Sequence, residues 1–170
     1  MEHSCRGENG NVFYFDGSRA GLAVCLGVAN VSGDGKIGRR YALPLAVAKA
    51  LQHVFHESVL GVIVIERSRY AMLHRGMVAT TRPNRILLAI SGDEFVARPE
   101  LLLHEYHHVL CQWRTGYLTR WRYVVECVRN GYLLNRYEQE ARAFAAANVE
   151  HYGGFLRDQG NVAAVTPEIT

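Results

Sequence analysis

Residues 99–113 read PELLLHEYHHVLCQW, and their apolar side chains recur at helical spacing. Pro99 suits the first helical position, and Glu100 suits the positive end of the helix dipole. At about 100° per residue, the apolar side chains form one stripe that is roughly 120° wide. His104 and His108 lie about 180° from the centre of that stripe. The sequence therefore predicts a helix that is anchored by one face and presents two histidines on the other.

His104, Glu105 and His108 fit the pattern H-E-x-x-H. Two histidines four residues apart on a helix lie one above the other, so both imidazoles can reach one Zn²⁺ ion. Glu105 points about 100° away from His104, where its carboxylate can take a proton from a metal-activated water. The alternative is a polar helix face with solvated histidines. A His104–His107 pair is a less well-attested chelate, and we interpret His107 as a residue that supports the ligands or lies at the surface.

A further helix is predicted over 135–150, and it contains Glu138 and Glu140. The two glutamates point about 160° apart, so only one of them can face the histidines. Glu138 shares its face with Ala141 and Ala145, whose short side chains permit a close approach of the two helices. We therefore predict Glu138 as the third metal ligand, and Glu140 remains the alternative.

The rest of the chain reads as an α+β domain: a small mixed sheet with one N-terminal helix, followed by a helical half. We expect one domain over 1–152 and a loosely packed tail over 153–170, which contains three glycines and a proline. The strand at 86–91 is either an edge strand that could pair with an extended peptide or an ordinary core strand. Strands are expected at 11–15, 22–29, 58–66, 76–81 and 86–91, and helices at 43–55, 99–113, 118–129 and 135–150.

Composition excludes several classes of protein. With 170 residues, 49% hydrophobic and 21% charged, the chain is neither disordered nor a fibrous rod. A net charge of +3 does not demand a nucleic-acid partner, and we predict none. No apolar run is long enough to span a bilayer and the N-terminus lacks the apolar segment of a secretory signal, so we expect a cytoplasmic protein; export by a signal-independent secretion system stays open.

Arginines gather between Arg114 and Arg142, with acidic residues interleaved. We interpret this region as a solvated helical surface. The alternative is a surface that holds an anionic substrate or partner.

Three segments together resemble a known family. They are Ala79-x-Thr81 with Asn84-Arg-Ile86, then Leu101–Leu110, then Tyr137-Glu-Gln-Glu-Ala141. They look like the small metallopeptidase domain found with bacterial contractile injection systems and polymorphic toxins, and more broadly like the gluzincin class of zinc peptidases. The resemblance covers residues 43–148, and it implies a zincin-like fold.

The resemblance implies zinc bound by His104, His108 and Glu138, with Glu105 as general base. It also implies a peptide or protein substrate, and a role as a delivered bacterial effector or toxin with a secretion-system or immunity partner. Many gluzincins place an aspartate four residues after the third-ligand glutamate, where it orients a zinc histidine. Here that position is Arg142, so the support of that histidine must come from elsewhere.

Two functional hypotheses follow from these residues. The first is a zinc-dependent peptidase, in which a further donor stabilises the oxyanion of the tetrahedral intermediate. The second is a zinc-binding structural or interaction module of a secretion apparatus, without turnover. The sequence offers four tyrosines as the oxyanion donor and does not choose among them: Tyr117, Tyr123, Tyr132 and Tyr137.

Overall fold

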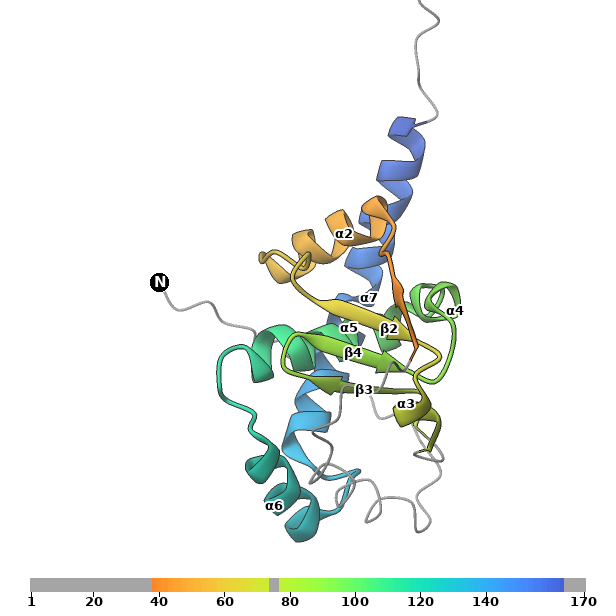
Figure 1. Ribbon diagram of the computed structural model, residues 1–170. Coiled ribbons are helices and arrows are strands. Elements are labelled where there is room, and N and C mark those ends of the chain that lie inside the picture. The colour runs from red at the N-terminus through yellow and green to blue at the C-terminus, as the bar shows by residue number, and fades with distance from the viewer. Residues whose placement is uncertain (1–37, 74–76, 164–170) are drawn as a thin grey trace, which may run out of the picture.

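The structure is a computed structural model, and it describes residues 38–73 and 77–163 (Figure 1). These residues form a small mixed sheet with helices packed against it, which confirms the predicted α+β class. The strands expected at 11–15 and 22–29 lie outside the described residues. None of the helices in the described ranges is long and apolar enough to cross a membrane.

The sheet contains four strands in the order β1-β2-β4-β3, namely β1 Arg39–Tyr41, β2 Ile63–Glu66, β4 Arg85–Leu88 and β3 Ala79–Arg82. β1 runs antiparallel to β2, β2 runs parallel to β4, and β4 runs antiparallel to β3. β4 is therefore an interior strand. Within the described part of the chain, β3 forms one edge of the sheet and β1 forms the other.

β3 and β4 form a hairpin that turns at Pro83-Asn84. Asn84 has a φ of 58°, a left-handed conformation that asparagine tolerates better than most residues. The strands predicted at 76–81 and 86–91 are thus present with shifted ends. β4 ends before residue 91 because Ser91 caps the next helix, accepting a hydrogen bond from the Glu94 backbone N–H at 3.2 Å.

Three short elements are absent from the sequence-based prediction: β1 and the five-residue helices α3 Arg69–Leu73 and α4 Gly92–Val96. They are too short for hydrophobic periodicity to register. The predicted strand over 58–66 begins only at Ile63, because Val59–Val62 forms a turn closed by a 3.0 Å backbone hydrogen bond.

The longer helices are α2 Leu45–Phe55, α5 Pro99–His107 with its continuation η1 His108–Trp113, α6 Arg120–Asn130, and α7 Arg136–Ala163. Figure 1 shows α5 and the long α7 behind the sheet. α2 packs against α7, and α7 packs most extensively against α5. All of these helices were predicted from the sequence, with ends shifted by a few residues except at the end of α7.

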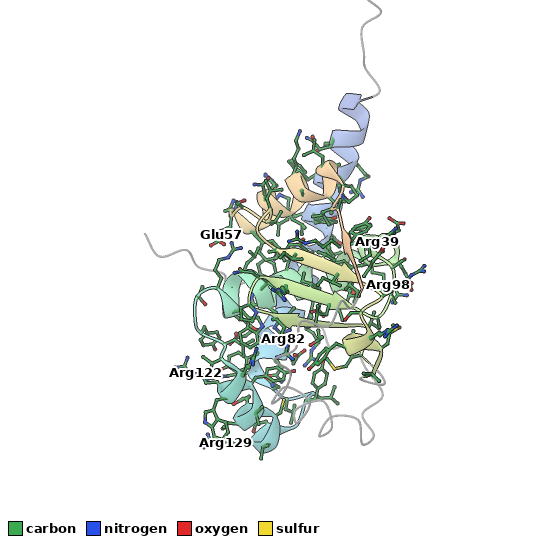
Figure 2. The ribbon with its side chains drawn as sticks, in the orientation of Figure 1. Arg39, Glu57, Arg82, Arg98, Arg122 and Arg129 are labelled. Atoms are coloured by element: carbon green, nitrogen blue, oxygen red, sulfur yellow. The ribbon has the colours of Figure 1, made fainter. Side chains whose placement is uncertain are left out.

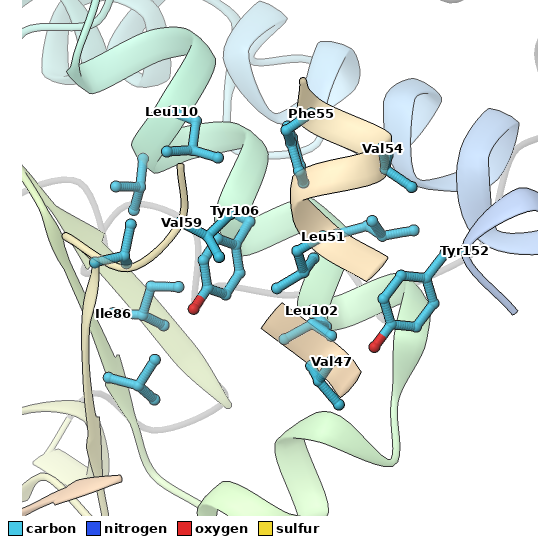
Figure 3. Close-up of a cluster of buried hydrophobic side chains, with 14 of the residues drawn as sticks. Val47, Leu51, Val54, Phe55, Val59, Ile86, Leu102, Tyr106, Leu110 and Tyr152 are labelled. Carbon is cyan, nitrogen blue, oxygen red and sulfur yellow. The ribbon is translucent and has the colours of Figure 1, made fainter. Parts of the chain in front are cut away.

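The main hydrophobic core lies between α2, α5, α7 and the sheet (Figure 3). Leu51 from α2, Ile86 from β4, and Leu102 and Tyr106 from α5 are each at most 1% exposed. Fully burying a side chain of this size stabilises the fold by about 1.5–3 kcal/mol. This core fixes the position of α5 against the sheet, and α5 carries the H-E-x-x-H pattern.

The end of α7 corrects one prediction. The helix continues through Gly153 and Gly154 to Ala163, whereas a loosely packed tail was expected from residue 153. Glycine costs up to about 1 kcal/mol in a helix, but tertiary packing overrides this cost. Tyr152 is fully buried, and Phe155 and Leu156 pack against the core.

Candidate metal centre

α5 carries His104, its continuation η1 begins with His108, and both histidines lie on the side that faces α7. The side chain of His104 is 14% exposed, and that of His108 is 5% exposed. The opposite side of α5 is held in the core by Leu102, Leu103 and Tyr106. The predicted anchoring is therefore present. The histidine face, however, is enclosed by α7 and β3 rather than open to solvent.

The helix changes its winding at the second histidine. Residues His108–Trp113 form a π-helical segment, where the Arg114 N–H donates to the Val109 carbonyl five residues earlier at 3.0 Å. The sequence predicts one regular helix over 99–113, so this widening is a correction. Single π-helical turns inside α-helices occur frequently at functional sites.

His104, His108 and Glu138 come together between α5 and α7. The Nε2 atoms of the two histidines are 3.1 Å apart. Glu138 Oε2 lies 3.3 Å from His104 Nε2, and Glu138 Oε1 lies 3.5 Å from His108 Nε2. One ligand atom from each of the three residues lies within 4.8 Å of the others, so the group could hold a metal ion.

Of the two glutamates on α7, the structure brings only Glu138 to the histidines. Glu138 is 4% exposed, and the alanines on its face, Ala141 and Ala145, are buried as the close helix contact requires. Glu140 turns away: it accepts hydrogen bonds from Gln112 Nε2 at 3.3 Å and from the Tyr117 hydroxyl at 2.8 Å.

Gln112 orients His108, and the sequence-based analysis missed it. Its Nε2 donates to the Tyr137 carbonyl at 3.0 Å and to Glu140, so its Oε1 must face His108 Nδ1, at 2.7 Å. An amide oxygen can only accept, so Nδ1 carries the proton and donates. Nε2 is then the nitrogen that can offer a lone pair to a metal. The sequence could have indicated Gln112 only through its spacing, because it follows His108 by four residues on one helix.

Arg142 takes a different role from that of the usual aspartate. Its Nη2 donates to the Leu133 carbonyl at 2.6 Å, which holds the loop between α6 and α7. The hydrogen bond to a ligand histidine that an aspartate would make at that position is made here by Gln112, which accepts from His108 Nδ1 at 2.7 Å. The departure from the gluzincin pattern at Arg142 therefore does not leave His108 without support.

Two of the four candidate tyrosines line the pocket around the three ligands, and two do not. The Tyr123 hydroxyl donates to Glu138 Oε1 at 2.8 Å, and Tyr132 lines the same pocket as Glu138. Burial and the charge of Glu138 raise the pKa of Tyr123, and the charge of Glu138 and burial raise that of Tyr132. Both therefore stay protonated and can donate. The Tyr117 hydroxyl donates a hydrogen bond to Glu140, and the Tyr137 hydroxyl accepts one from Arg136 Nη2 at 2.8 Å.

Glu105 lines the same pocket without belonging to the group of three ligands. It is 6% exposed. Burial raises the pKa of its carboxyl, although His104 and His108 act in the opposite direction. A buried carboxylate with a raised pKa beside a candidate metal site has the properties of a general base.

The charges of Glu138 and of the two histidines compensate one another. Burial alone would lower the pKa of His108, but the negative charge of Glu138, with Oε1 3.5 Å from His108 Nε2, outweighs it and raises this pKa to about 9. Burial would likewise raise the pKa of Glu138, and His108 and His104 instead hold it well below its usual range.

His107 is deeply buried, which corrects the surface alternative in its prediction. It is 3% exposed, and its ring packs against Phe144 of α7 at 4.8 Å between centroids. Burial, with the nearby His108 and His104, lowers its pKa to about 3, so it is neutral. The His107 ring therefore packs against α7 and does not form a chelate with His104.

The strand beside the site is β3, not the strand predicted at 86–91. β4 is paired on both sides, whereas Ala79–Arg82 of β3 lines the pocket together with the three ligands. Trp113 Nε1 donates to Thr81 Oγ1 at 3.1 Å and so ties the end of η1 to this strand. The edge could not be predicted because strand order is a long-range property of the sheet.

The donor set fits a metal ion. Glu138 Oε2 is buried and makes no hydrogen bond, its nearest charged neighbour being His104 Nε2 at 3.3 Å, whereas its other oxygen accepts from Tyr123. A buried carboxylate oxygen without a partner is costly unless something else satisfies it. Two imidazole nitrogens and one carboxylate are a known three-ligand set for catalytic zinc, with a fourth position left open.

Most arginines between Arg114 and Arg142 are exposed, and several pair locally, as Arg114 does with Glu57 at 3.2 Å. Figure 2 shows Arg122 and Arg129 on α6, apart from Arg82 on β3. Arg82 does line the pocket, and its Nη2 donates to the Tyr70 hydroxyl at 2.7 Å.

No family model, curated protein or solved structure matches this chain.

Proposed function

We propose that this protein is a zinc-dependent peptidase of the zincin type. The observation that carries the proposal is the convergence of His104, His108 and Glu138 from two helices, with the buried carboxyl of Glu105 beside them. Zinc at this site would polarise a substrate carbonyl and lower the pKa of a bound water towards about 7.

The residues around the ligands have separate roles in this proposal. Glu105 accepts the proton of the attacking water and passes it to the leaving amine. Gln112 holds His108 in the tautomer that leaves Nε2 free to bind metal. Tyr123 and Tyr132 keep their protons and are the two candidates for the donor that stabilises the oxyanion.

An extended peptide is the substrate that fits the surroundings of the site. β3 lines the pocket and, among the described strands, pairs on one side only. Its other side presents backbone N–H and C=O groups, and a substrate backbone can pair with such an edge by β-augmentation. This pairing would place a peptide bond alongside the ligand group without requiring a particular side chain.

The test is Glu105→Gln, with Glu150→Gln as the matched control because Glu150 is exposed on α7. We expect Glu105→Gln to retain zinc and to lose at least about 100-fold in peptide hydrolysis, because it cannot act as a base. Glu150→Gln should keep both. The measurements are zinc content and cleavage of a pool of unfolded proteins.

Loss of zinc in Glu105→Gln would make Glu105 a ligand and contradict its role as base. A zinc-loaded wild type that cleaves nothing in the pool, with a Glu105→Gln form that behaves identically, would instead favour a zinc-binding module without turnover.

A further inference from the structure

Three histidines that the proposed reaction does not use gather where the end of α2 meets α7. His53 lies in the last turn of α2, His56 follows that helix, and His151 lies on α7. His53 Nε2 and His151 Nε2 are 3.0 Å apart, and both residues are exposed. A dissolved ion can therefore reach this pair directly.

The His53–His151 pair has nearly the same geometry as the histidine pair of the candidate metal centre. The Nε2–Nε2 distances are 3.0 Å and 3.1 Å, the ring centroids are 4.8 Å and 4.6 Å apart, and the interplanar angles are 80° and 86°. Two imidazole nitrogens bound at about 2.0–2.1 Å to one ion lie roughly 2.9–3.4 Å apart. Both pairs fall within this range.

A neighbouring side chain holds the ring of His53 in place. His53 is stacked on Phe155 with centroids 4.5 Å apart and an interplanar angle of 19°. Phe155 itself packs against the core, so it forms a platform that limits the motion of the imidazole. A ligand whose rotamer is already restrained loses less entropy when it binds a metal.

We propose that His53 and His151 form a second metal site, which binds one divalent transition ion such as Zn²⁺ with water at the remaining positions. Imidazole suits Zn²⁺, Ni²⁺ and Cu²⁺. The site lacks a carboxylate and is open to solvent, so it binds more weakly than the first centre. Because its ligands come from two helices, the ion clamps the end of α2 to α7.

The experiment is a calorimetric titration of metal-free protein with Zn²⁺, using wild type, His53→Ala, His151→Ala and His56→Ala. We expect wild type to bind about two equivalents of Zn²⁺, one tightly at the three-ligand site and one more weakly at the two-histidine site. His53→Ala and His151→Ala should each lose the weaker equivalent and keep the tight one. His56→Ala, an exposed neighbour with its ring centroid 6.4 Å from that of His53, should keep both.

Hydrogen exchange provides a second readout. Saturating Zn²⁺ should slow exchange in 149–156 of α7 in wild type but not in His53→Ala. A weaker equivalent that is absent from wild type, or that survives in both single variants, would overturn the proposal, as would its loss in His56→Ala. Glu138→Gln should weaken only the tight equivalent, so failure of the first centre and failure of this site are distinguishable.

Discussion

Among the described residues of α7, Glu138 alone combines the two properties that a ligand at this site needs, namely its position and its reach. It lies on the face of α7 that is lined with alanine and packs closely on α5, and its carboxylate reaches both imidazoles. One oxygen is held by Tyr123 while the other is buried without a hydrogen-bond partner. This pattern is expected of a metal ligand: a hydrogen bond to one oxygen orients the carboxylate, and the lone pairs of the other oxygen can bind an ion.

Glu138→Gln should therefore weaken zinc binding by about 10-fold or more, because the amide removes the anionic ligand. Glu140→Gln is the control two residues away, and it should leave zinc affinity nearly unchanged. A zinc titration of both variants measures the difference. Equal losses in the two variants would contradict the assignment of Glu138 as the ligand.

At the scale of elements, the π-helical segment η1 links α5 to both α7 and β3. Through Gln112 it contacts the start of α7, where the amide donates to the Tyr137 carbonyl. Through Trp113 it contacts β3. The orientation of His108 thus depends on how η1, α7 and β3 pack together, in addition to the spacing of residues along α5.

Gln112→Ala should lower zinc affinity by about 10–100-fold while leaving the three ligands in place, because His108 Nδ1 loses its acceptor. The surface variant Gln139→Ala serves as control, since Gln139 is exposed on α7. Competition with a calibrated chelator measures the affinities. An unchanged affinity in Gln112→Ala would show that the amide does not orient His108.

At the scale of the whole molecule, the sheet is held at both edges by side-chain contacts. The β3 edge lies against the candidate metal centre. At the β1 edge, Glu66 accepts a hydrogen bond from Arg39 Nε at 2.9 Å and another from the Gly92 N–H at 2.8 Å. Gly92 has no room for a side chain because the ring of Tyr41 occupies the place of a Cβ. This contact joins β1, β2 and α4.

Glu66 should make global unfolding depend on pH. The Gly92 N–H, together with Arg39, holds the pKa of the Glu66 carboxyl below its usual value of 4.5. A carboxyl with a depressed pKa in the folded state stabilises it fully above the unfolded-state pKa, and this contribution is lost as the pH falls below that value. Glu66→Gln should therefore lower the free energy of unfolding at pH 7, and the difference from wild type should shrink towards pH 3.

Urea unfolding at the two pH values measures this difference. Glu94→Gln, which removes an exposed ion pair with Arg98, is the control and should change stability by less than about 1 kcal/mol at either pH. A difference between wild type and Glu66→Gln that stays constant from pH 7 to pH 3 would contradict the prediction.

The sequence by itself determined the long helices and the residues that face one another across them. Helical periodicity, a local property repeated every 3.6 residues, predicted that His104, His108 and Glu138 face one another, and the structure brings these three side chains together. The tertiary structure alone decided which strand is the edge, that Gln112 supports His108, and that α7 continues past Gly153. Each of these depends on contacts between residues far apart in the chain, and packing free energy there exceeds the local preferences that a sequence pattern records.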